Sequence, residues 1–226
     1  KRVLYTVFMK YLLTSTGLTN DSIAGALEKA VGKPLSDTSV LFIPTAANTE
    51  GGDKRWLIEN LLQFTNYGVG SIDILDITAV PDELWKERFQ EKDVICFGGG
   101  NEKYLADVLE SLNMKEFLET LTDKVYMGIS AGSMVTGVFM PEELYPMVFP
   151  EEDFGAITKD GMNLCNFCFI PHLNSTFFTH IRKENLDEVQ DAFATTVYAV
   201  DDDTALLVEE GAVTIIGDGE YALLER

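Results

Sequence analysis

The chain has 226 residues, of which 46% are hydrophobic and 24% are charged, a composition typical of a soluble globular protein with one core. Its 37 acidic and 17 basic residues give a formal net charge of −20. This charge argues against nucleic acid or an anionic membrane as a partner, because both require clustered Lys and Arg. No apolar run in the sequence reaches the ~20 residues that span a membrane.

The first eight residues look like an addition to the domain. Lys1-Arg2 and the apolar run that follows resemble a signal peptide, but Lys10 interrupts the run and no small-residue cleavage site comes after it. Met9 is a natural start. We therefore expect one domain over residues 9–226, with residues 1–8 as an upstream extension.

Strand-like and helix-like patterns alternate from residue 10 onward. Apolar runs predict strands at 11–15, 40–44, 71–77 and 94–97 and from Val125, and amphipathic patterns predict helices at 21–30, 54–67, 81–90, 102–112 and 115–121. Asn20 or Asp21 is expected to cap the first helix, and Gly32 to end it. This alternation indicates an α/β fold, a mostly parallel sheet covered on both faces, whose ligands bind beyond the carboxyl ends of the strands.

The pattern is looser in the last third of the chain. Residues 139–154 carry prolines and five acids, which predicts a loop or cover segment. Further strands are expected at 167–171 and 197–200, a helix at 183–193, and a hairpin made of 205–208 and 212–216 with glycine-containing turns.

The sequence Gly128-Ile-Ser-Ala-Gly132 between the fifth strand and a helix matches the G-x-S-x-G pattern of a nucleophile elbow. In such a turn the central Ser130 stands exposed above the sheet, and a side chain at either glycine would collide with a neighbouring strand or helix. The free N–H groups of the following helix would stabilise negative charge on a substrate oxygen. The simpler interpretation is that small residues only allow a helix to pack closely on the sheet.

A serine nucleophile needs a base, and the chain has two histidines. We favour His172 over His180 because His172 directly follows an apolar strand, at the same carboxyl edge as Ser130. Either could instead be a structural histidine bonded to the backbone. The base in turn needs a carboxylate, for which Asp201, Asp202 and Asp203 compete with Glu142 and Glu143.

Gly98-Gly-Gly-Asn101 follows the fourth strand and could cradle a phosphate, but the P-loop Lys and the G-x-G-x-x-G spacing are both missing. We therefore expect no cofactor. The same backbone can instead offer an N–H to a tetrahedral oxyanion, together with the N–H of Ala131.

The three cysteines are Cys96, Cys165 and Cys168. An odd number in a chain of this length is typical of a reducing cytoplasm, which is the location that we expect. Cys165-Asn-Phe-Cys168 has the spacing of metal ligands, but no second pair accompanies it and an apolar run follows. We therefore expect buried structural thiols and no metal site.

Four motifs, taken together, resemble the dipeptidase E (aspartyl dipeptidase) and cyanophycinase family of serine peptidases. These motifs are Phe97-Gly-Gly-Gly-Asn101, Gly128-Ile-Ser-Ala-Gly132, Ile170-Pro-His-Leu173 and Asp201-Asp-Asp-Thr-Ala-Leu206, and the resemblance runs from about Met9 to the C-terminus. It implies a flavodoxin-like three-layer sandwich similar to class I glutamine amidotransferases. The amidotransferases use a cysteine nucleophile, so Ser130 argues against glutaminase activity.

The resemblance implies Ser130 as the nucleophile, His172 as the general base and Asp202 as the acid, with Glu143 as the alternative acid. It implies an oxyanion hole of Gly99 or Gly100 with Ala131, next to Asn101.

An Arg that is expected to hold an N-terminal aspartate in dipeptidase E relatives aligns here with Leu186, with Arg182 nearby but out of register. A preference for aspartyl substrates is therefore not expected.

The function expected is that of a serine exopeptidase acting on short peptides, as a monomer or a homodimer. The alternatives are a non-catalytic module that binds a small ligand on the same scaffold, and an esterase or acyl transferase that uses the same serine.

Overall fold

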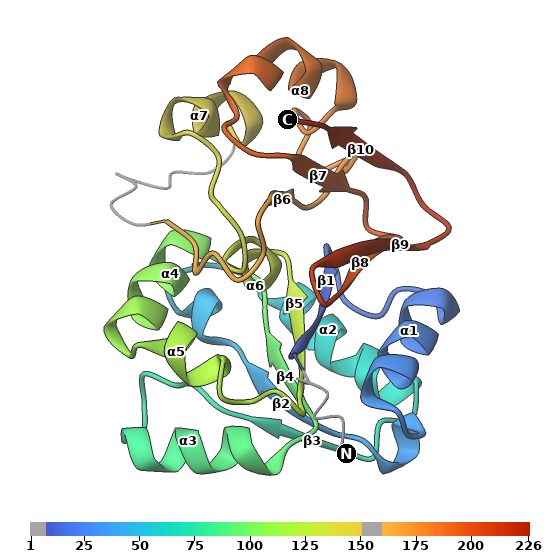
Figure 1. Cartoon of the computed structure of the whole chain (residues 1–226), viewed down its shortest axis with the longest axis vertical. Coiled ribbons are helices and arrows are strands. Elements are labelled where there is room, and N and C mark those ends of the chain that lie inside the picture. The colour runs from blue at the N-terminus through green and yellow to red at the C-terminus, as the bar shows by residue number, and fades with distance from the viewer. Residues whose placement is uncertain (1–7, 151–159) are drawn as a thin grey trace, which may run out of the picture.

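The computed structural model describes residues 8–150 and 160–226, and its largest element is a seven-stranded sheet (Figure 1). Its strands are β1 (Lys10–Thr14), β2 (Ser39–Ile43), β3 (Ser71–Ile74), β4 (Val94–Phe97), β5 (Val125–Ile129), β8 (Thr204–Glu209) and β9 (Ala212–Gly217), in the order β3-β2-β4-β5-β1-β8-β9. The first five are parallel. The β8–β9 hairpin continues the sheet antiparallel to β1.

Helices cover both faces of this sheet (Figure 1). They are α1 (Asp21–Val31), α2 (Arg55–Asn66), α3 (Asp82–Glu91), α4 (Glu102–Ser111) and α5 (Met114–Leu118). In β2, Val40 and Phe42 lie in a core with residues of α1 and α2, whereas Leu41 and Ile43 lie in a second core with residues of α3, α4 and α5. Because strand side chains alternate between faces, strands buried on both sides must be apolar throughout. The predicted α/β sandwich with a mostly parallel sheet is confirmed.

The ends of α1 follow the sequence signals. The Asn20 side chain accepts a hydrogen bond from the N–H of Ile23, and Gly32 has a left-handed backbone with φ 80°. A polar cap and a terminal glycine satisfy backbone groups that the helix itself cannot pair. The predicted bounds of this helix are therefore set by local chemistry.

A second, three-stranded sheet lies above the first in Figure 1 and was not expected. It consists of β6 (Cys168–Ile170), β7 (Val197–Val200) and β10 (Tyr221–Leu224), in the order β10-β7-β6, and is accompanied by α7 (Tyr145–Val148) and α8 (Lys183–Val189). The sequence pattern placed the strand before His172 so that His172 would share the carboxyl edge of the parallel sheet with Ser130. The strand, β6, instead pairs with β7 in the small sheet, and His172 reaches Ser130 from there.

Four short 3-10 helices complete the described residues, η1 (Leu35–Asp37), η2 (Thr45–Asn48), η3 (Glu142–Leu144) and η4 (Gln190–Ala192). The helix expected at 183–193 is thus divided into α8 and η4. The cover segment expected at 139–154 contains η3 and α7 up to residue 150, and residues 151–154 lie outside the described residues. The extension expected at residues 1–8 also lies outside the described residues, except for Phe8. None of the helices in the described ranges has the length and apolar character needed to span a bilayer.

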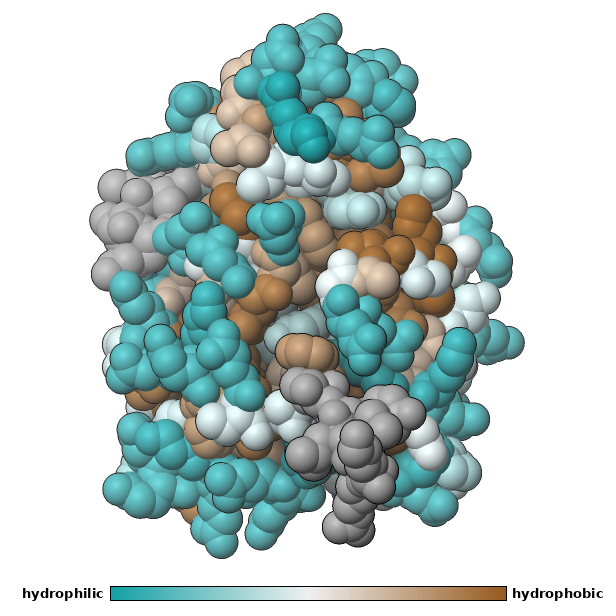
Figure 2. Space-filling model, viewed as in Figure 1, coloured by the Kyte–Doolittle hydropathy of each residue, from teal (hydrophilic) through white to brown (hydrophobic). Residues whose placement is uncertain are grey.

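Figure 2 shows how polarity is distributed over one face. Hydrophilic residues cover most of it, and apolar residues gather in its middle, between the bodies built on the large and the small sheet. Beneath this surface the largest buried rings include Trp85, Tyr126 and Phe97. Full burial of side chains of this kind contributes about 1.5–3 kcal/mol each, so the two cores dominate the stability of the platform that carries the site.

Candidate active site

Ser130 lies in the tight turn between β5 and the short helix α6 (Ala131–Met134). Its backbone has φ 50° and ψ −111°, a conformation that residues with a side chain rarely adopt. The turn is held by the N–H of Ser130, which donates to the carbonyl of Thr14 on β1 at 2.9 Å. Such strain persists only where surrounding contacts fix it, and it concentrates at functional sites.

Both glycines of the elbow are enforced by their neighbours. A Cβ at Gly128 would lie 2.6 Å from the backbone of Ser133, and one at Gly132 would lie 2.0 Å from the carbonyl oxygen of Phe97. The buried hydroxyl of Tyr126 also donates to the carbonyl of Gly132 at 2.6 Å. At Gly128 and Gly132 the backbone therefore lies so close to α6 and β4 that a residue with a side chain would not fit.

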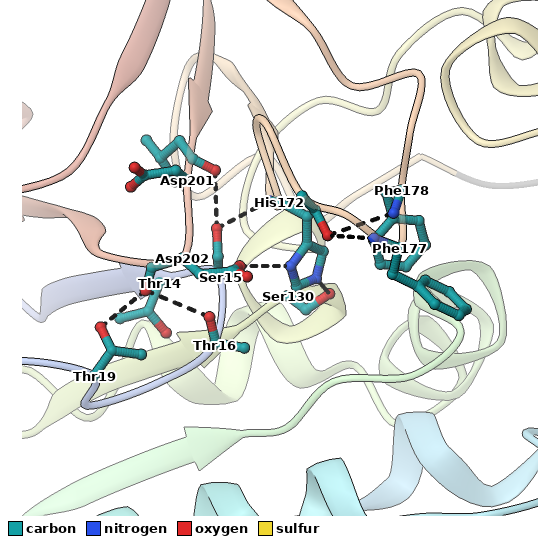
Figure 3. A network of polar contacts seen from close by, with 12 residues as sticks. Thr14, Ser15, Thr16, Thr19, Ser130, His172, Phe177, Phe178, Asp201 and Asp202 are labelled. Atoms are coloured by element: carbon teal, nitrogen blue, oxygen red, sulfur yellow. Dashed lines mark hydrogen bonds and ion pairs between the residues drawn. The ribbon is translucent and has the colours of Figure 1, made fainter.

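Ser130, His172 and Asp202 form a continuous hydrogen-bonded row (Figure 3). The Oγ of Ser130 is 3.0 Å from Nε2 of His172, and Nδ1 of His172 is 2.8 Å from Oδ1 of Asp202. Because an ionised carboxylate can only accept, the proton of the neutral imidazole belongs on Nδ1. Nε2 is then free to accept the hydroxyl proton of Ser130, which is the arrangement that a general base requires.

The pKa of Asp202 lies below the ordinary value of a carboxyl group. Burial alone would raise this pKa, but the hydrogen bond to His172, the charge of that imidazole and a hydrogen bond from Thr16 together outweigh it. The carboxylate therefore stays ionised at neutral pH. It can fix the tautomer of His172 and stabilise its protonated form.

The loop between β1 and α1 holds His172 and Asp202 in place (Figure 3). The buried hydroxyl of Ser15 accepts the backbone N–H of His172 at 3.0 Å and donates to the carbonyl of Val200 at 3.0 Å. The hydroxyls of Thr16 and Thr19 donate to the backbone carbonyl of Asp202 at 3.4 and 2.8 Å. One loop thus ties the strand ends that carry the base and the acid.

Three backbone amides near Ser130 are left for an oxyanion. Within residues 8–150 and 160–226, no protein acceptor takes the N–H of Gly99, Gly100 or Ala131. A Cβ at Gly99 would lie 3.4 Å from the Cβ of Ser130, so this loop runs directly beside the hydroxyl. The N–H of Asn101, by contrast, donates to Ala46, and its side chain caps α4 by accepting from Tyr104. We therefore leave Asn101 out of the oxyanion hypothesis.

The remaining candidates from the sequence lie outside this row. His180 and Glu143 are exposed, and no hydrogen bond or ring contact joins either to Ser130 or His172 among the described residues. Asp201 accepts from the backbone N–H groups of Asp203 and Glu220, so it stabilises the turns between strands. Of the three consecutive acids, it is Asp202 that meets the imidazole.

The three cysteines are unpaired and buried, as expected from the sequence. Burial raises the pKa of each thiol, to about 11 for Cys165 and about 12 for Cys168. Buried neutral thiols of this kind pack as small apolar side chains.

A family model for peptidase family S51 matches residues 11–216. The chain belongs to peptidase family S51. Two curated proteins are similar to this S51 chain, the uncharacterized peptidases Lin0382 of Listeria innocua and Lmo0363 of Listeria monocytogenes. The first is 24% identical over 82% of this chain and 88% of its own length, and the second is 23% identical over 77% and 83%. The resemblance to dipeptidase E relatives is thereby confirmed at the level of the family, which is a peptidase family.

Solved structures agree on the fold of this S51 member. One is a 1.5 Å crystal structure from Listeria monocytogenes EGD-e, described as a candidate peptidase E protein. It superposes with a TM-score of 0.74 at 22% identity and covers 93% of this chain and 99% of its own. The other is a peptidase from an acI-B1 Actinobacterium, with a TM-score of 0.70 at 22% identity, covering 96% and 91%.

Sequence reasoning missed the residues that support the row. Ser15, Thr16 and Thr19 were not singled out, although a run of hydroxyl residues directly after a buried parallel strand is a signal for the ligand edge of the sheet. Phe178, whose ring stacks on the imidazole of His172 at 4.9 Å between centroids, gave no such signal. Its role depends on how the loop after β6 folds.

Proposed function

We propose that this S51 member is a serine peptidase that hydrolyses short peptides through an acyl-enzyme on Ser130. The observation that carries the proposal is the hydrogen-bonded row from Ser130 through His172 to Asp202, placed on a strained elbow. Membership of a peptidase family supports peptides as the substrate. The restriction to short peptides rests on the resemblance to dipeptidase E relatives.

The steps of the proposed reaction follow from the positions of these groups. Nε2 of His172 takes the hydroxyl proton as Oγ of Ser130 bonds to the carbonyl carbon. The amides of Ala131 and of Gly99 or Gly100 stabilise the oxyanion. As the C–N bond breaks, the imidazolium gives its proton to the departing amine, which leaves an ester on Ser130. A water molecule, deprotonated by the same imidazole, then cleaves this ester and restores the hydroxyl.

The deciding experiment compares the wild-type protein with Ser130→Ala on a library of dipeptides and tripeptides. We expect Ser130→Ala to lose kcat by roughly 10³–10⁶ while its melting temperature is retained. Ser111→Ala, an exposed serine on α4, is the matched control and should hydrolyse at the wild-type rate. Equal hydrolysis by wild type and Ser130→Ala would refute the proposal.

Labelling with a fluorophosphonate separates the alternative functions. A mass increase located on Ser130 indicates an activated hydroxyl, whereas an inert serine with no peptide turnover would favour the non-catalytic binding module. If the labelled serine cleaves short esters but no peptides, an esterase or acyl transferase is the correct assignment.

A further inference from the structure

Two phenylalanine rings extend from the imidazole on the side opposite Asp202 (Figure 3). The ring of Phe178 stacks on His172 at 4.9 Å with an interplanar angle of 22°. The ring of Phe177 meets Phe178 edge to face, again at 4.9 Å. Phe177 is therefore only two ring contacts away from the group that activates Ser130, yet it is 65% exposed.

The loop that carries these rings is fixed by its own hydrogen bonds. The hydroxyl of Ser175 accepts from the N–H groups of Phe177 and Phe178 at 3.1 and 3.4 Å. Arg182 closes the loop by donating to the carbonyls of Ser175, Phe178 and Ile181. Because the backbone is held at both ends, the exposed position of Phe177 is built into the fold.

A third ring lies beside the glycine loop. A Cβ at Gly99 would be 3.4 Å from the Cβ of Ser130 and 3.6 Å from Cζ3 of Trp56. The half-buried indole of Trp56, on α2, and Ser130 therefore both flank Gly99. Aromatic rings from two separate parts of the chain thus border the row, Phe178 at His172 and Trp56 at the glycine loop.

The cations of the same segments are already bonded within the protein. Arg182 uses its guanidinium on the three carbonyls of the loop, and Lys183 pairs with Asp187 at 2.6 Å. On the side of Trp56, Lys54 donates to the carbonyl of Ala47 and Arg55 pairs with Asp53. Leu186, which stands where an aspartate-binding Arg was considered, is fully buried. An acidic substrate side chain would meet aromatic carbon here, in a protein of net charge −20.

We infer that Phe177, Phe178 and Trp56 form a subsite for an apolar side chain, on the residue whose carbonyl Ser130 attacks. The inference rests on the proposed function, because it defines the substrate class of the same site. That side chain branches one carbon away from the reacting carbonyl, so it extends toward the rings that flank His172 and Gly99. An isolated exposed phenylalanine would not indicate a binding site. Phe177 does so because it contacts Phe178, which stacks on the imidazole of His172.

The test measures kcat/KM for Phe-Ala, Leu-Ala, Asp-Ala and Lys-Ala. We expect the two apolar dipeptides to exceed Asp-Ala by at least about tenfold, the discrimination that an apolar pocket typically reaches. Phe177→Ala should lower kcat/KM for Phe-Ala about fivefold, chiefly through KM, and Phe177→Leu should restore most of it. Phe177→Arg should reverse the order in favour of Asp-Ala. Leu84→Ala, an exposed apolar residue on α3, is the control and should change none of these ratios.

Binding to the Ser130→Ala variant keeps the two proposals separate. Its affinities for Phe-Ala and Asp-Ala, measured by calorimetry, report the subsite without any turnover. If the wild type hydrolyses no peptide but the variant prefers Phe-Ala, the proposed function fails and the subsite stands. If hydrolysis depends on Ser130 but Asp-Ala is bound and cleaved as well as Phe-Ala, the subsite is refuted and the peptidase stands.

Discussion

Ser15 and His172 are 157 residues apart in the sequence, and the hydroxyl of the first accepts the backbone N–H of the second at 3.0 Å. The same hydroxyl donates to Val200, two residues before Asp202. His172 itself has a positive φ of 64°, which an L-residue adopts only when contacts enforce it. A single buried hydroxyl in the loop after β1 thus positions the ends of two strands of the small sheet.

Replacement of Ser15 should therefore affect turnover without any contact to substrate. Ser15→Ala leaves the N–H of His172 without its acceptor, and we expect kcat to fall about 10- to 100-fold with KM nearly unchanged. Loss of the buried hydrogen bonds should also lower the free energy of unfolding by about 1–3 kcal/mol. Steady-state kinetics and urea denaturation measure the two effects. Ser15→Cys keeps the volume and a weak donor, so its kcat should lie between those of wild type and Ser15→Ala. A change in KM with kcat unchanged would exclude a positioning role for Ser15.

The identity of the acid is tested by two isosteric changes. Asp202→Asn keeps the shape of the side chain but removes the charge and favours the wrong tautomer of His172, so kcat should fall by about 10²–10⁴. Glu143→Gln, on the exposed η3 helix, should stay within about twofold of wild type. The comparison is made on a peptide that the wild type cleaves. A larger loss for Glu143→Gln would transfer the role to that residue.

The lowered pKa of Asp202 predicts a pH-dependent contribution to stability. The folded carboxyl has a pKa below its unfolded value of about 3.9, so its contribution is complete above that pH and is lost as the pH falls through the folded pKa. The difference in unfolding free energy between wild type and Asp202→Asn should therefore shrink as the pH falls below about 5. Urea denaturation between pH 7 and 3 checks this, and a difference that stays constant down to pH 3 would contradict it.

The elbow glycines should tolerate no side chain. A Cβ at Gly132 would lie 2.0 Å from a backbone oxygen of β4, so Gly132→Ala must displace the elbow and should cost about 3 kcal/mol or more of stability, together with activity. Gly25→Ala is the matched control, because no atom lies within 4 Å of a Cβ there. As an interior helical position, it should gain about 0.5–1 kcal/mol. The melting temperatures of both variants test these expectations. An unchanged melting temperature for Gly132→Ala would show that the elbow can relax to accept a side chain.

The sequence was sufficient for the features that depend on local chemistry. Apolar runs defined the parallel strands, Asn20 and Gly32 defined the ends of α1, and the spacing of two glycines around Ser130 defined the elbow. These follow from backbone constraints and burial within a few residues of each position.

Features that depend on pairing between distant segments could not be predicted from local sequence patterns. Three-residue β6 and four-residue β7 carry no signal for which sheet they join, so the small sheet was missed. The family resemblance favoured Asp202 as the acid, but the residue pattern itself did not distinguish Asp201, Asp202 and Asp203. Only the path of the chain turns the middle carboxylate toward His172 and the first toward Glu220.

The proposed nucleophile and the pair proposed to activate it belong to different sheets and to different stages of chain synthesis. Ser130 follows β5, whereas His172 and Asp202 follow β6 and β7 much later in the chain. A ribosome-bound chain that has completed only the first five strands would therefore display the serine without a base. Under the proposed mechanism such a chain is inert, and hydrolytic competence appears only when the last third of the polypeptide docks. By that mechanism, the order of residues would delay peptide cleavage until folding is nearly complete.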